Sequence, residues 1–393
     1  MNNFQFYSPT EFVFGRDTEC EAGNYVKKHG GSKVLLHYGG GSAVRSGLLG
    51  RIKASLTEAG IGFTELGGVR PNPRDTLVYD GIRLARSEGV DFILAVGGGS
   101  TIDSSKAIAM GVPYDGDFWD FYCGKAAPSA ALPVGTVLTI AAAGSEGSGD
   151  SVITKESDGL KRGAGSDLIR PRFSVMNPAL TCTLPPYQTA CGATDIMAHV
   201  FERYFTNTTE VGITDRLCEA VLKTMIAETP RVIAQPDNYD ARANIMWAGT
   251  VAHTNIVGVG REQDWNSHGI EHELSALYDC AHGAGLAVIM PAWMEFVCGH
   301  DVMRFAQAAV RVWGCEMNFA NPEATAREGI FRFRQFLHGI GMPVNFAELG
   351  ADEADIPKLV EKFGIGRRRT GGFVKLSADD VAEIYRIAAH AAL

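Results

Sequence analysis

Three histidines lie close together in the second half of the chain, at a spacing that could bind a transition metal. His268 and His272 are four residues apart in a stretch whose apolar residues recur at helical spacing. Both imidazoles should therefore project from one face of a helix. His282 follows after a turn of small residues. Imidazole is the commonest side-chain ligand of transition metals, so the three rings could converge on one ion.

A second pair of possible ligands lies upstream. Asp195 and His199 are also four residues apart, within a helical pattern. Two such pairs facing each other would offer one carboxylate and three imidazoles, a mixture that suits Fe²⁺ and is acceptable to Zn²⁺. Any single histidine here could be an ordinary polar residue. Five potential ligands in two paired spacings favour a metal site.

These two stretches resemble the metal-binding half of the iron-containing (group III) alcohol dehydrogenases, in particular the butanol dehydrogenase branch. The pattern of that family is Asp-x₃-His, followed by His-x₃-His-x₉-His, and the resemblance extends over nearly the whole chain. It implies that Asp195, His199, His268 and His282 bind the metal and that His272 lies beside the substrate. The metal implied is one divalent ion, Fe²⁺ or Zn²⁺, and such a site also tolerates Ni²⁺.

Composition places the chain among soluble globular enzymes. Its 393 residues suffice for two domains, with 46% hydrophobic and 21% charged residues. The net charge of −9 argues against a nucleic-acid partner. We find no signal peptide and no apolar run of the ~18–20 residues needed to span a membrane. Eight cysteines without a Cys-x-x-Cys pair indicate reduced thiols in a cytoplasmic protein.

The first half of the chain alternates strand and helix patterns. Buried strands joined through glycine-rich turns to helices predict βαβ units and a parallel sheet. Residues 4–14 predict two short strands joined by a turn, and this exposed segment could pair across subunits. The further strands are expected at 34–38, 61–66, 91–96, 136–140 and 172–178, with helices at 48–56, 76–88 and 100–110.

Gly-Gly-Gly-Ser occurs twice, at 39–42 and 97–100, each time between a strand and a helix. Backbone N–H groups and the helix dipole make such places suitable for phosphate. Neither copy has the G-x-G-x-x-G spacing of the usual dinucleotide fingerprint. One copy alone could be a tight turn, whereas two in the same context favour a nucleotide.

The resemblance implies which residues contact that nucleotide. The motif at 97–103 looks like the pyrophosphate loop of the family, and 39–42 lies where the family holds the adenosine ribose. Members that prefer NAD(H) place an Asp there, so its absence favours NADP(H) over NAD(H). The contacts implied are Gly39, Gly40, Ser42, Pro71, Asn72, Gly98, Gly99, Ser100, Asp103, Thr139, Ser145 and Lys161.

The chain departs from the family pattern at two places. The usual Pro-Ala-Thr-Gly-Ser-Glu reads Ala-Ala-Ala-Gly-Ser-Glu at 141–146, which removes one hydroxyl, and a downstream Asn is replaced within 147–150. Both changes weaken the expectation of cofactor contacts at 146–152. Lys161 lies near the position of a cofactor-contacting lysine, and a solvated lysine fits the sequence equally well.

Pro185 and Pro186 interrupt regular structure and predict a domain boundary. We expect a dinucleotide-binding α/β domain at 1–185 and an all-helical, metal-binding domain at 186–393, an architecture like that of dehydroquinate synthase. A basic loop at 364–372 is expected to be solvated, with a phosphate or acidic partner as the alternative. The helices are expected at 187–205, 211–228, 240–256, 266–278, 284–299, 300–314, 322–340, 351–362 and 378–391.

A nucleotide beside a metal with an open position predicts metal-assisted hydride transfer. The resemblance implies an alcohol dehydrogenase or aldehyde reductase acting on a small primary alcohol or aldehyde, such as butanol or butanal, and it suggests a homodimer. His272 could relay the proton, because a histidine pKa can lie near neutrality.

Three other functions remain open. A glycerol dehydrogenase-like polyol oxidoreductase and a dehydroquinate synthase-like lyase share the expected architecture. The lyase needs a cluster of Lys and Arg for its phosphorylated substrate, and none occurs near 195–199 or 266–282. A non-enzymatic metal or nucleotide binder is the third, and His272 argues against it because binding alone would not require this residue.

Overall fold

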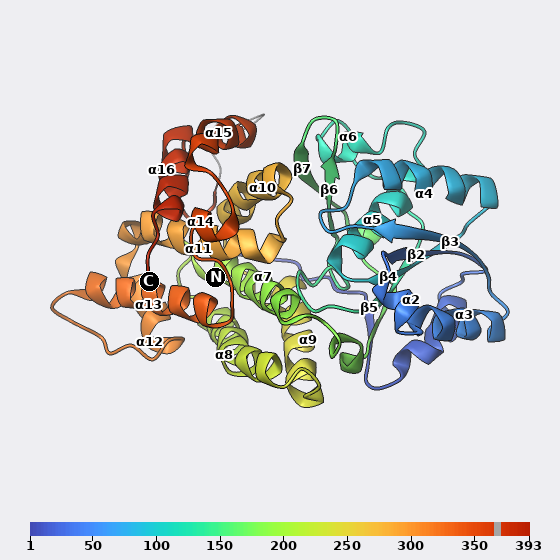
Figure 1. Ribbon diagram of the computed structural model, residues 1–393, viewed down its shortest axis with the longest axis horizontal. Coiled ribbons are helices and arrows are strands. Elements are labelled where there is room, and N and C mark those ends of the chain that lie inside the picture. Colours follow the sequence, from blue (N-terminus) through green and yellow to red (C-terminus); the bar gives the residue numbers. More distant parts are fainter. Residues whose placement is uncertain (365–370) are drawn as a thin grey trace. The chain divides into compact units, whose positions relative to one another are not determined.

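The computed structural model describes residues 1–364 and 371–393, which form two compact units (Figure 1). The sheet unit comprises Tyr7–Leu184 and Asp237–Thr250, and the helical unit comprises Met1–Phe6, Pro185–Pro236 and Val251–Leu393. Two short segments, Met1–Phe6 and Asp237–Thr250, thus belong to a different unit from their neighbours in sequence. The expected basic loop falls mainly on 365–370, outside the described residues.

The sheet unit contains a six-stranded parallel sheet in the order β1-β8-β5-β4-β2-β3. This confirms the expected fold class. The strands are β1 (Glu11–Phe14), β2 (Lys33–Gly39), β3 (Gly62–Val69), β4 (Phe92–Gly97), β5 (Val134–Leu138) and β8 (Phe173–Met176). The helices are α1 (Ala22–Lys28), α2 (Ser42–Arg45), α3 (Leu48–Glu58), α4 (Asp75–Glu88), α5 (Gly99–Gly111) and α6 (Trp119–Tyr122).

Both faces of the sheet are covered by helices. Every residue of β4 is buried, as expected for a strand with helices on both sides. Successive residues of a strand point to opposite faces, so Leu36 packs with Ile52 of α3 while Leu35 packs with Ile108 of α5. The continuous apolar runs of the sequence therefore become the centre of the sheet.

Two expectations for the sheet unit were wrong or incomplete. The first half of the 4–14 segment is not a strand: only Glu11–Phe14 is, and it pairs with β8. Pro9 has no N–H with which to pair with another strand. Just before this segment, the N–H of Asn2 donates to the Gly260 carbonyl at 2.7 Å. The antiparallel hairpin of β6 (Asp150–Lys155) and β7 (Leu160–Gly165) was not expected at all.

The helical unit is built around α11 (His282–Val297). All residues from 283 to 294 are buried, which follows from a helix that is apolar on every side. Helices α7, α10, α13 and α16 pack against it. The other α-helices of this unit are α7 (Pro186–Tyr204), α8 (Gly212–Ala234), α10 (Asn266–Tyr278), α12 (Val302–Arg311), α13 (Pro322–Gly339), α14 (Phe346–Leu349), α15 (Ile356–Gly364) and α16 (Ala378–Ala389). Most of α9 (Tyr239–His253) belongs to the sheet unit.

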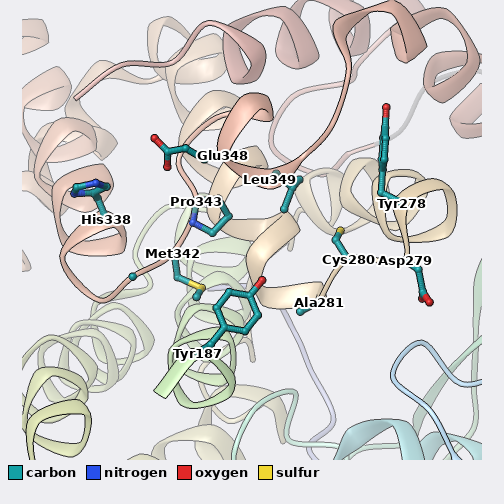
Figure 2. Close-up of a pocket in the computed structure, with 11 residues that line it drawn as sticks. Tyr187, Tyr278, Asp279, Cys280, Ala281, His338, Met342, Pro343, Glu348 and Leu349 are labelled. Atoms are coloured by element: carbon teal, nitrogen blue, oxygen red, sulfur yellow. The ribbon is translucent and has the colours of Figure 1, made fainter. Parts of the chain in front are cut away.

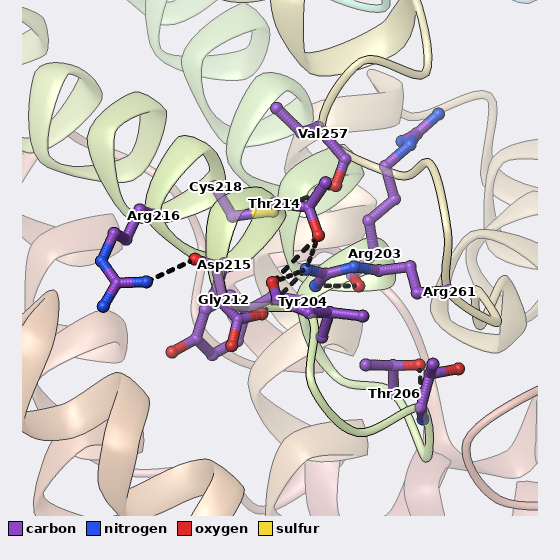
Figure 3. Close-up of polar contacts among 12 residues, drawn as sticks. Arg203, Tyr204, Thr206, Gly212, Thr214, Asp215, Arg216, Cys218, Val257 and Arg261 are labelled. Carbon is purple, nitrogen blue, oxygen red and sulfur yellow. Dashed lines mark hydrogen bonds and ion pairs between the residues drawn. The ribbon is translucent and has the colours of Figure 1, made fainter. Parts of the chain in front are cut away.

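A buried ionic cluster ties several segments of this unit together (Figure 3). Asp215 on α8 accepts hydrogen bonds from Arg261 at 2.8 Å and from Arg304 on α12 at 2.5 and 2.7 Å. Arg261 also donates to the carbonyl of Arg203, near the end of α7. The cluster therefore anchors the segment before α10. Within the described part of the chain, no helix combines the length and apolarity needed to cross a membrane.

Candidate metal centre and cofactor loops

Three helices of the helical unit place the predicted metal ligands. Asp195 and His199 lie one turn apart on α7, and His268 lies in the first turn of α10. The chain then turns through Asp279, whose φ of 51° is left-handed. His282 follows as the first residue of α11. The structure thus brings the four residues together from three helices, with Asp195 and His199 on one face of α7.

The carboxylate oxygen Oδ1 of Asp195 is the centre of this group. It lies 3.3 Å from Nε2 of His199, 3.7 Å from Nε2 of His268 and 3.8 Å from Nε2 of His282. Asp195, His199 and His268 are between 4% and 6% exposed. One possible ligand atom from each of Asp195, His268 and His282 lies within 4.8 Å of the other two, so these residues could hold one metal ion.

Two buried polar atoms of this group have no hydrogen-bond partner within the described residues, and a metal ion would satisfy them. Oδ1 of Asp195 and Nε2 of His268 are buried and have no hydrogen-bond partner among the described residues. Burying such atoms without a partner costs free energy, and a divalent cation would satisfy both at once. One carboxylate with three imidazoles is also a usual donor set for Fe²⁺ or Zn²⁺.

The charges around these side chains set their protonation states. Burial favours the protonated form of Asp195, but His268 and His282 outweigh it and lower the carboxyl pKa. Burial and the neighbouring His253 and His268 hold the pKa of His199 well below its usual value. Burial also opposes charge on His268, yet Asp195 and Glu202 raise its pKa to about 9. An ionised Asp195 and a neutral His199 are therefore ready to act as ligands.

His272 lies at the edge of the group. It projects from α10 one turn after His268, and its ring centroid is 5.5 Å from that of His282. It is half-buried, and it forms a second possible metal group with Glu271 and His282. The residue thus lies beside the predicted ligands without belonging to the group around Asp195.

Sequence reasoning missed two carboxylates that contact the predicted ligands. Oε1 of Glu202 lies 3.0 Å from Nδ1 of His268, and Oε2 of Glu271 contacts Nδ1 of His282. Glu202 is seven residues after Asp195, and Glu271 is three after His268. Both spacings repeat the face of a helix, so this signal could have been noticed.

An aromatic lid, consisting of His253 and Trp265, covers His199. The ring centroid of His253 is 4.2 Å from that of His199, and the Trp265 ring meets His199 and His268 edge-on at 5.5 and 5.3 Å. The guanidinium of Arg203 lies 4.7 Å from the Trp265 ring centroid. Neither His253 nor Trp265 was assigned a role from the sequence alone.

Most of the predicted cofactor residues lie at the carboxyl ends of neighbouring strands of the sheet. Strands β3, β2, β4 and β5 are neighbours and parallel, so the segments that follow them begin side by side. The last residue of β2, Gly39, and these segments together contain all the predicted contacts except Asp103, Ser145 and Lys161. Helix α5 begins at Gly99 without a side-chain cap, and its first turn is a suitable place for a phosphate group.

The hairpin brings Lys161 close to these residues as well. Its ammonium donates to Oδ1 of Asn72 at 3.0 Å, and Lys161 is only 4% exposed. The N–H of Thr154 donates to the Pro73 carbonyl at 2.8 Å. Lys161 is therefore not a solvated surface lysine, which was the alternative from sequence.

Asp103 and Ser145 are hydrogen-bonded to each other, and a buried lysine, Lys106, holds the loop that contains Ser145. The Ser145 hydroxyl donates to Asp103 at 2.5 Å, and Lys106 donates to carbonyls of Ser145, Ser148 and Asp150 at 2.7 to 2.9 Å. Burial lowers the pKa of Lys106 to about 8. These contacts hold the 144–150 loop against α5.

A cavity of about 590 Å³ lies within the helical unit (Figure 2). Tyr187, Cys280, Ala281 and Met342 are among the residues that line it, and Ala281 directly precedes His282. None of the predicted ligands or cofactor contacts lines this cavity. It is thus separate from the group around Asp195.

Comparison with known proteins identifies the class to which this fold and site belong. The model for iron-containing alcohol dehydrogenases matches residues 9–178, and the model for the C-terminal part of that family matches residues 189–389. The chain belongs to the iron-containing alcohol dehydrogenase family, which confirms the resemblance seen in the sequence. It is an oxidoreductase of the alcohol dehydrogenase and aldehyde reductase type.

Individual relatives extend over almost the whole chain. It is 41% identical over 391 residues to NADH-dependent butanol dehydrogenase A of Clostridium acetobutylicum, covering 98% of this chain and 99% of that protein. It is 36% identical to the NADPH-dependent aldehyde reductase YqhD of Escherichia coli, covering 92% and 93%. The crystal structure of NADH-dependent butanol dehydrogenase A from Thermotoga maritima superposes with a TM-score of 0.96, at 39% identity and 99% coverage of both chains.

Proposed function

We propose that this protein interconverts small primary alcohols and aldehydes, using a nicotinamide cofactor and one divalent metal ion. The observation that carries the proposal is the convergence of three Nε2 atoms on Oδ1 of Asp195, at 3.3 to 3.8 Å. Butanol and butanal are the proposed substrates, because butanol dehydrogenases are among the relatives. The ion proposed is Fe²⁺ or Zn²⁺, with Ni²⁺ also compatible.

Each residue group has a distinct task in this proposal. Asp195, His199, His268 and His282 hold the metal. When bound, the ion supplies a Lewis acid for the substrate oxygen and the nicotinamide exchanges a hydride with the substrate carbon. His272 moves the hydroxyl proton through a ring nitrogen. The loop amides at the start of α5 orient the cofactor by holding its pyrophosphate.

We infer a preference for NADP(H) from the loop after β2. Positions 39 and 40 are glycines and carry no carboxylate that would repel a 2′-phosphate. The guanidinium of Arg45 lies so close to Gly41 that a Cβ there would collide with it, which adds positive charge at this loop. The relatives include both NADH-dependent and NADPH-dependent enzymes, so the preference rests on these residues.

Location and assembly are the remaining parts of the proposal. All eight cysteines are free, which supports a reducing, cytoplasmic environment. A homodimer is inferred from the family resemblance, and size-exclusion chromatography with light scattering tests it. A mass of one 42.2 kDa chain would contradict the dimer.

The decisive experiment measures butanal reduction with NADPH and with NADH on protein whose metal content is known. We expect metal-dependent turnover that is faster with NADPH. Asp195→Asn should lose metal and turnover together, because it removes the charged ligand at the centre of the group. Faster turnover with NADH would overturn only the cofactor preference. Full metal content and turnover in Asp195→Asn would overturn the ligand assignment.

A further inference from the structure

Two of the proposed metal ligands, His268 and His282, contact buried carboxylates through Nδ1, the ring nitrogen that is not directed at Asp195. Nδ1 of His268 lies 3.0 Å from Oε1 of Glu202, and Nδ1 of His282 contacts Oε2 of Glu271. Both glutamates are fully buried. Buried carboxylates are costly unless they are paired and hydrogen-bonded, so these contacts require an explanation.

Glu202 is built into its position by neighbours on α10. Its Oε1 accepts hydrogen bonds from the Ser267 hydroxyl and from the backbone N–H of His268, the latter at 3.0 Å. Because Glu202 lies two helical turns after Asp195, α7 supplies both a ligand and the support for a ligand on α10. The carboxylate therefore contacts both the backbone and the ring of His268.

Glu271 is held in a comparable way between α10 and α11. Its Oε1 accepts a hydrogen bond from the Ser275 hydroxyl, one turn later on α10. Gly285 of α11 packs directly against it, since a Cβ at that glycine would lie 2.5 Å from Oε1 and 2.8 Å from Cγ of Glu271. The absence of a side chain at Gly285 thus leaves the space that Glu271 occupies.

These contacts determine which ring nitrogen faces the metal. An ionised carboxylate only accepts hydrogen bonds, so each Nδ1 that contacts one carries the proton. When the ring is neutral, as a metal ligand must be, its lone pair is then on Nε2, which faces Oδ1 of Asp195 at 3.7 Å in His268 and 3.8 Å in His282. His199 differs, because its buried Nδ1 has no partner within the described residues.

We propose that Glu202 and Glu271 are positioning residues of the metal centre, which fix the tautomer and ring orientation of His268 and His282. The inference rests on the proposed function, since it requires a metal at Asp195. It predicts that the carboxylates govern how long the ion is retained. A purely structural role, in which they only brace helices, predicts a loss of stability without a change in metal retention.

Glu271 should matter more than Glu202, because the two histidines are supported differently. The ring of His268 is 8% exposed and is enclosed by the rings of His199 and Trp265, at 4.5 and 5.3 Å. The His282 side chain is 24% exposed and begins its helix. Without Glu271, the ring of His282 loses its main restraint.

The test loads wild type and variants with Co²⁺ and follows its release to excess EDTA. We expect Glu271→Gln to release the ion about 10- to 100-fold faster, and Glu202→Gln to show a smaller increase. Gly285→Ala keeps the carboxylate but displaces it, so it should also accelerate release. The visible spectrum of bound Co²⁺ should change in Glu271→Gln, because the donor strength of His282 falls.

Glu219→Gln is the matched control. Glu219 is a buried carboxylate of the same unit that accepts a hydrogen bond from Tyr204 at 3.0 Å, away from the metal ligands. Its substitution should lower the melting temperature and leave Co²⁺ release unchanged. The melting temperature of each metal-free variant separates a folding defect from a defect in retention.

The outcomes separate this inference from the proposed function. Wild-type protein that binds no Co²⁺ would contradict the metal centre itself. Wild-type binding with equal release rates in Glu271→Gln and Gly285→Ala would overturn the positioning role alone. If Glu271→Gln does not fold, Gly285→Ala decides the question, because it disturbs the same contact with the carboxylate in place.

Discussion

Three imidazoles surround one carboxylate oxygen at the metal centre, and their protonation states differ. The pKa of His199 is held well below its usual value by burial and by His253, whereas Asp195 and Glu202 raise that of His268 to about 9 against the effect of burial. A metal must therefore displace a proton from His268 at neutral pH. Metal binding should release protons and weaken as the pH falls.

His272 is the residue whose role is most directly testable. We expect His272→Ala to retain the metal, because His272 does not belong to the group of possible ligands around Asp195, and to lose about 10²-fold or more in turnover. The pH dependence of turnover should change as well. Steady-state rates of butanal reduction between pH 5 and 9, with metal analysis of the same samples, check this prediction.

His390→Ala serves as the control for His272, since the His390 side chain is 69% exposed. It should leave turnover and metal content unchanged. A His272→Ala protein with the wild-type pH profile would exclude the proton relay. Loss of the metal in this variant would instead make His272 a ligand.

The sequence shows which residues are candidate ligands, and helical spacing places Glu202 and Glu271 on the same helix faces, but it does not show which histidine each glutamate contacts. Asp195 with His199, and His268 with His272, are visible because a helix brings residues four apart onto one face. Glu202 and Glu271 act on histidines that are 66 and 11 residues away. Those pairs arise only when α7, α10 and α11 pack together.

Within the sheet unit, a buried histidine links three elements. Nδ1 of His37 on β2 donates to the Leu66 carbonyl on β3 at 2.8 Å, and its Nε2 accepts from the Ser104 hydroxyl on α5 at 2.9 Å. Burial lowers the pKa of His37 to about 4, although the contact with Leu66 opposes the change. The folded protein therefore keeps this ring neutral.

This pKa has a consequence for stability. Because the folded value of about 4 lies below the ordinary 6.5, the unfolded chain binds a proton that the folded chain does not between these values. His37 should contribute its full stability above pH 6.5, and about 3 kcal/mol of it should be lost as the pH falls to 4. Urea unfolding of wild type and His37→Gln across this range measures the difference.

The free energy of unfolding of His37→Gln should change less with pH than that of wild type, whatever the absolute stability of the variant. His390→Gln, which alters an exposed histidine, should retain the wild-type slope. Equal slopes for wild type and His37→Gln would show that His37 does not govern acid sensitivity.

In the helical unit, the buried carboxylate of Asp215 links α8 to Arg261 and to Arg304 of α12. Asp215→Asn would leave Arg261 and Arg304 without their carboxylate, and the Arg261 side chain is fully buried. Breaking a buried pair in this way should cost about 3 kcal/mol. Urea unfolding checks this value, with Glu323→Gln, which breaks an exposed pair with Arg327, expected to change stability by less than about 1 kcal/mol.

Sequence patterns predicted elements well where the local signal and the packing agree. Strands β2 and β4 are mainly apolar, and both have a paired strand on each side in the sheet. Strand β7 reads Leu-Lys-Arg-Gly-Ala-Gly, which has little strand propensity. Its hairpin is held from outside instead, by Lys106 at Asp150 and by Thr154 at Pro73.

At the scale of the whole molecule, the chain does not divide at one point. Residues 237–250 read as ordinary helix, and their periodicity says nothing about which unit they join. The structure answers through contacts: Thr250 donates to Glu146 at 2.6 Å, and the Trp247 ring lies 5.7 Å from that of Phe12. Such pairings across about 100 residues or more cannot be read from local patterns.

The division nevertheless separates the two proposed binding sites. All four proposed metal ligands lie in the helical unit, and all proposed cofactor contacts lie in the sheet unit. A ligand stabilises the structure to which it binds by an amount set by its concentration and affinity, about 2.7 kcal/mol at 100 times the dissociation constant. Each ligand should therefore slow local opening mainly within its own unit.

Hydrogen exchange followed by mass spectrometry tests this expectation. Removing the metal should accelerate exchange in peptides from 186–204 and 266–290 and leave 33–45 and 92–111 unchanged. Adding NADPH to the metal-free protein should slow exchange in 33–45 and 92–111. In Asp195→Asn, adding metal should change nothing, which makes this variant the control. If removing the metal accelerated exchange equally in both units, the two sites would be coupled through the whole molecule, and the assignment of each ligand to one unit would be wrong.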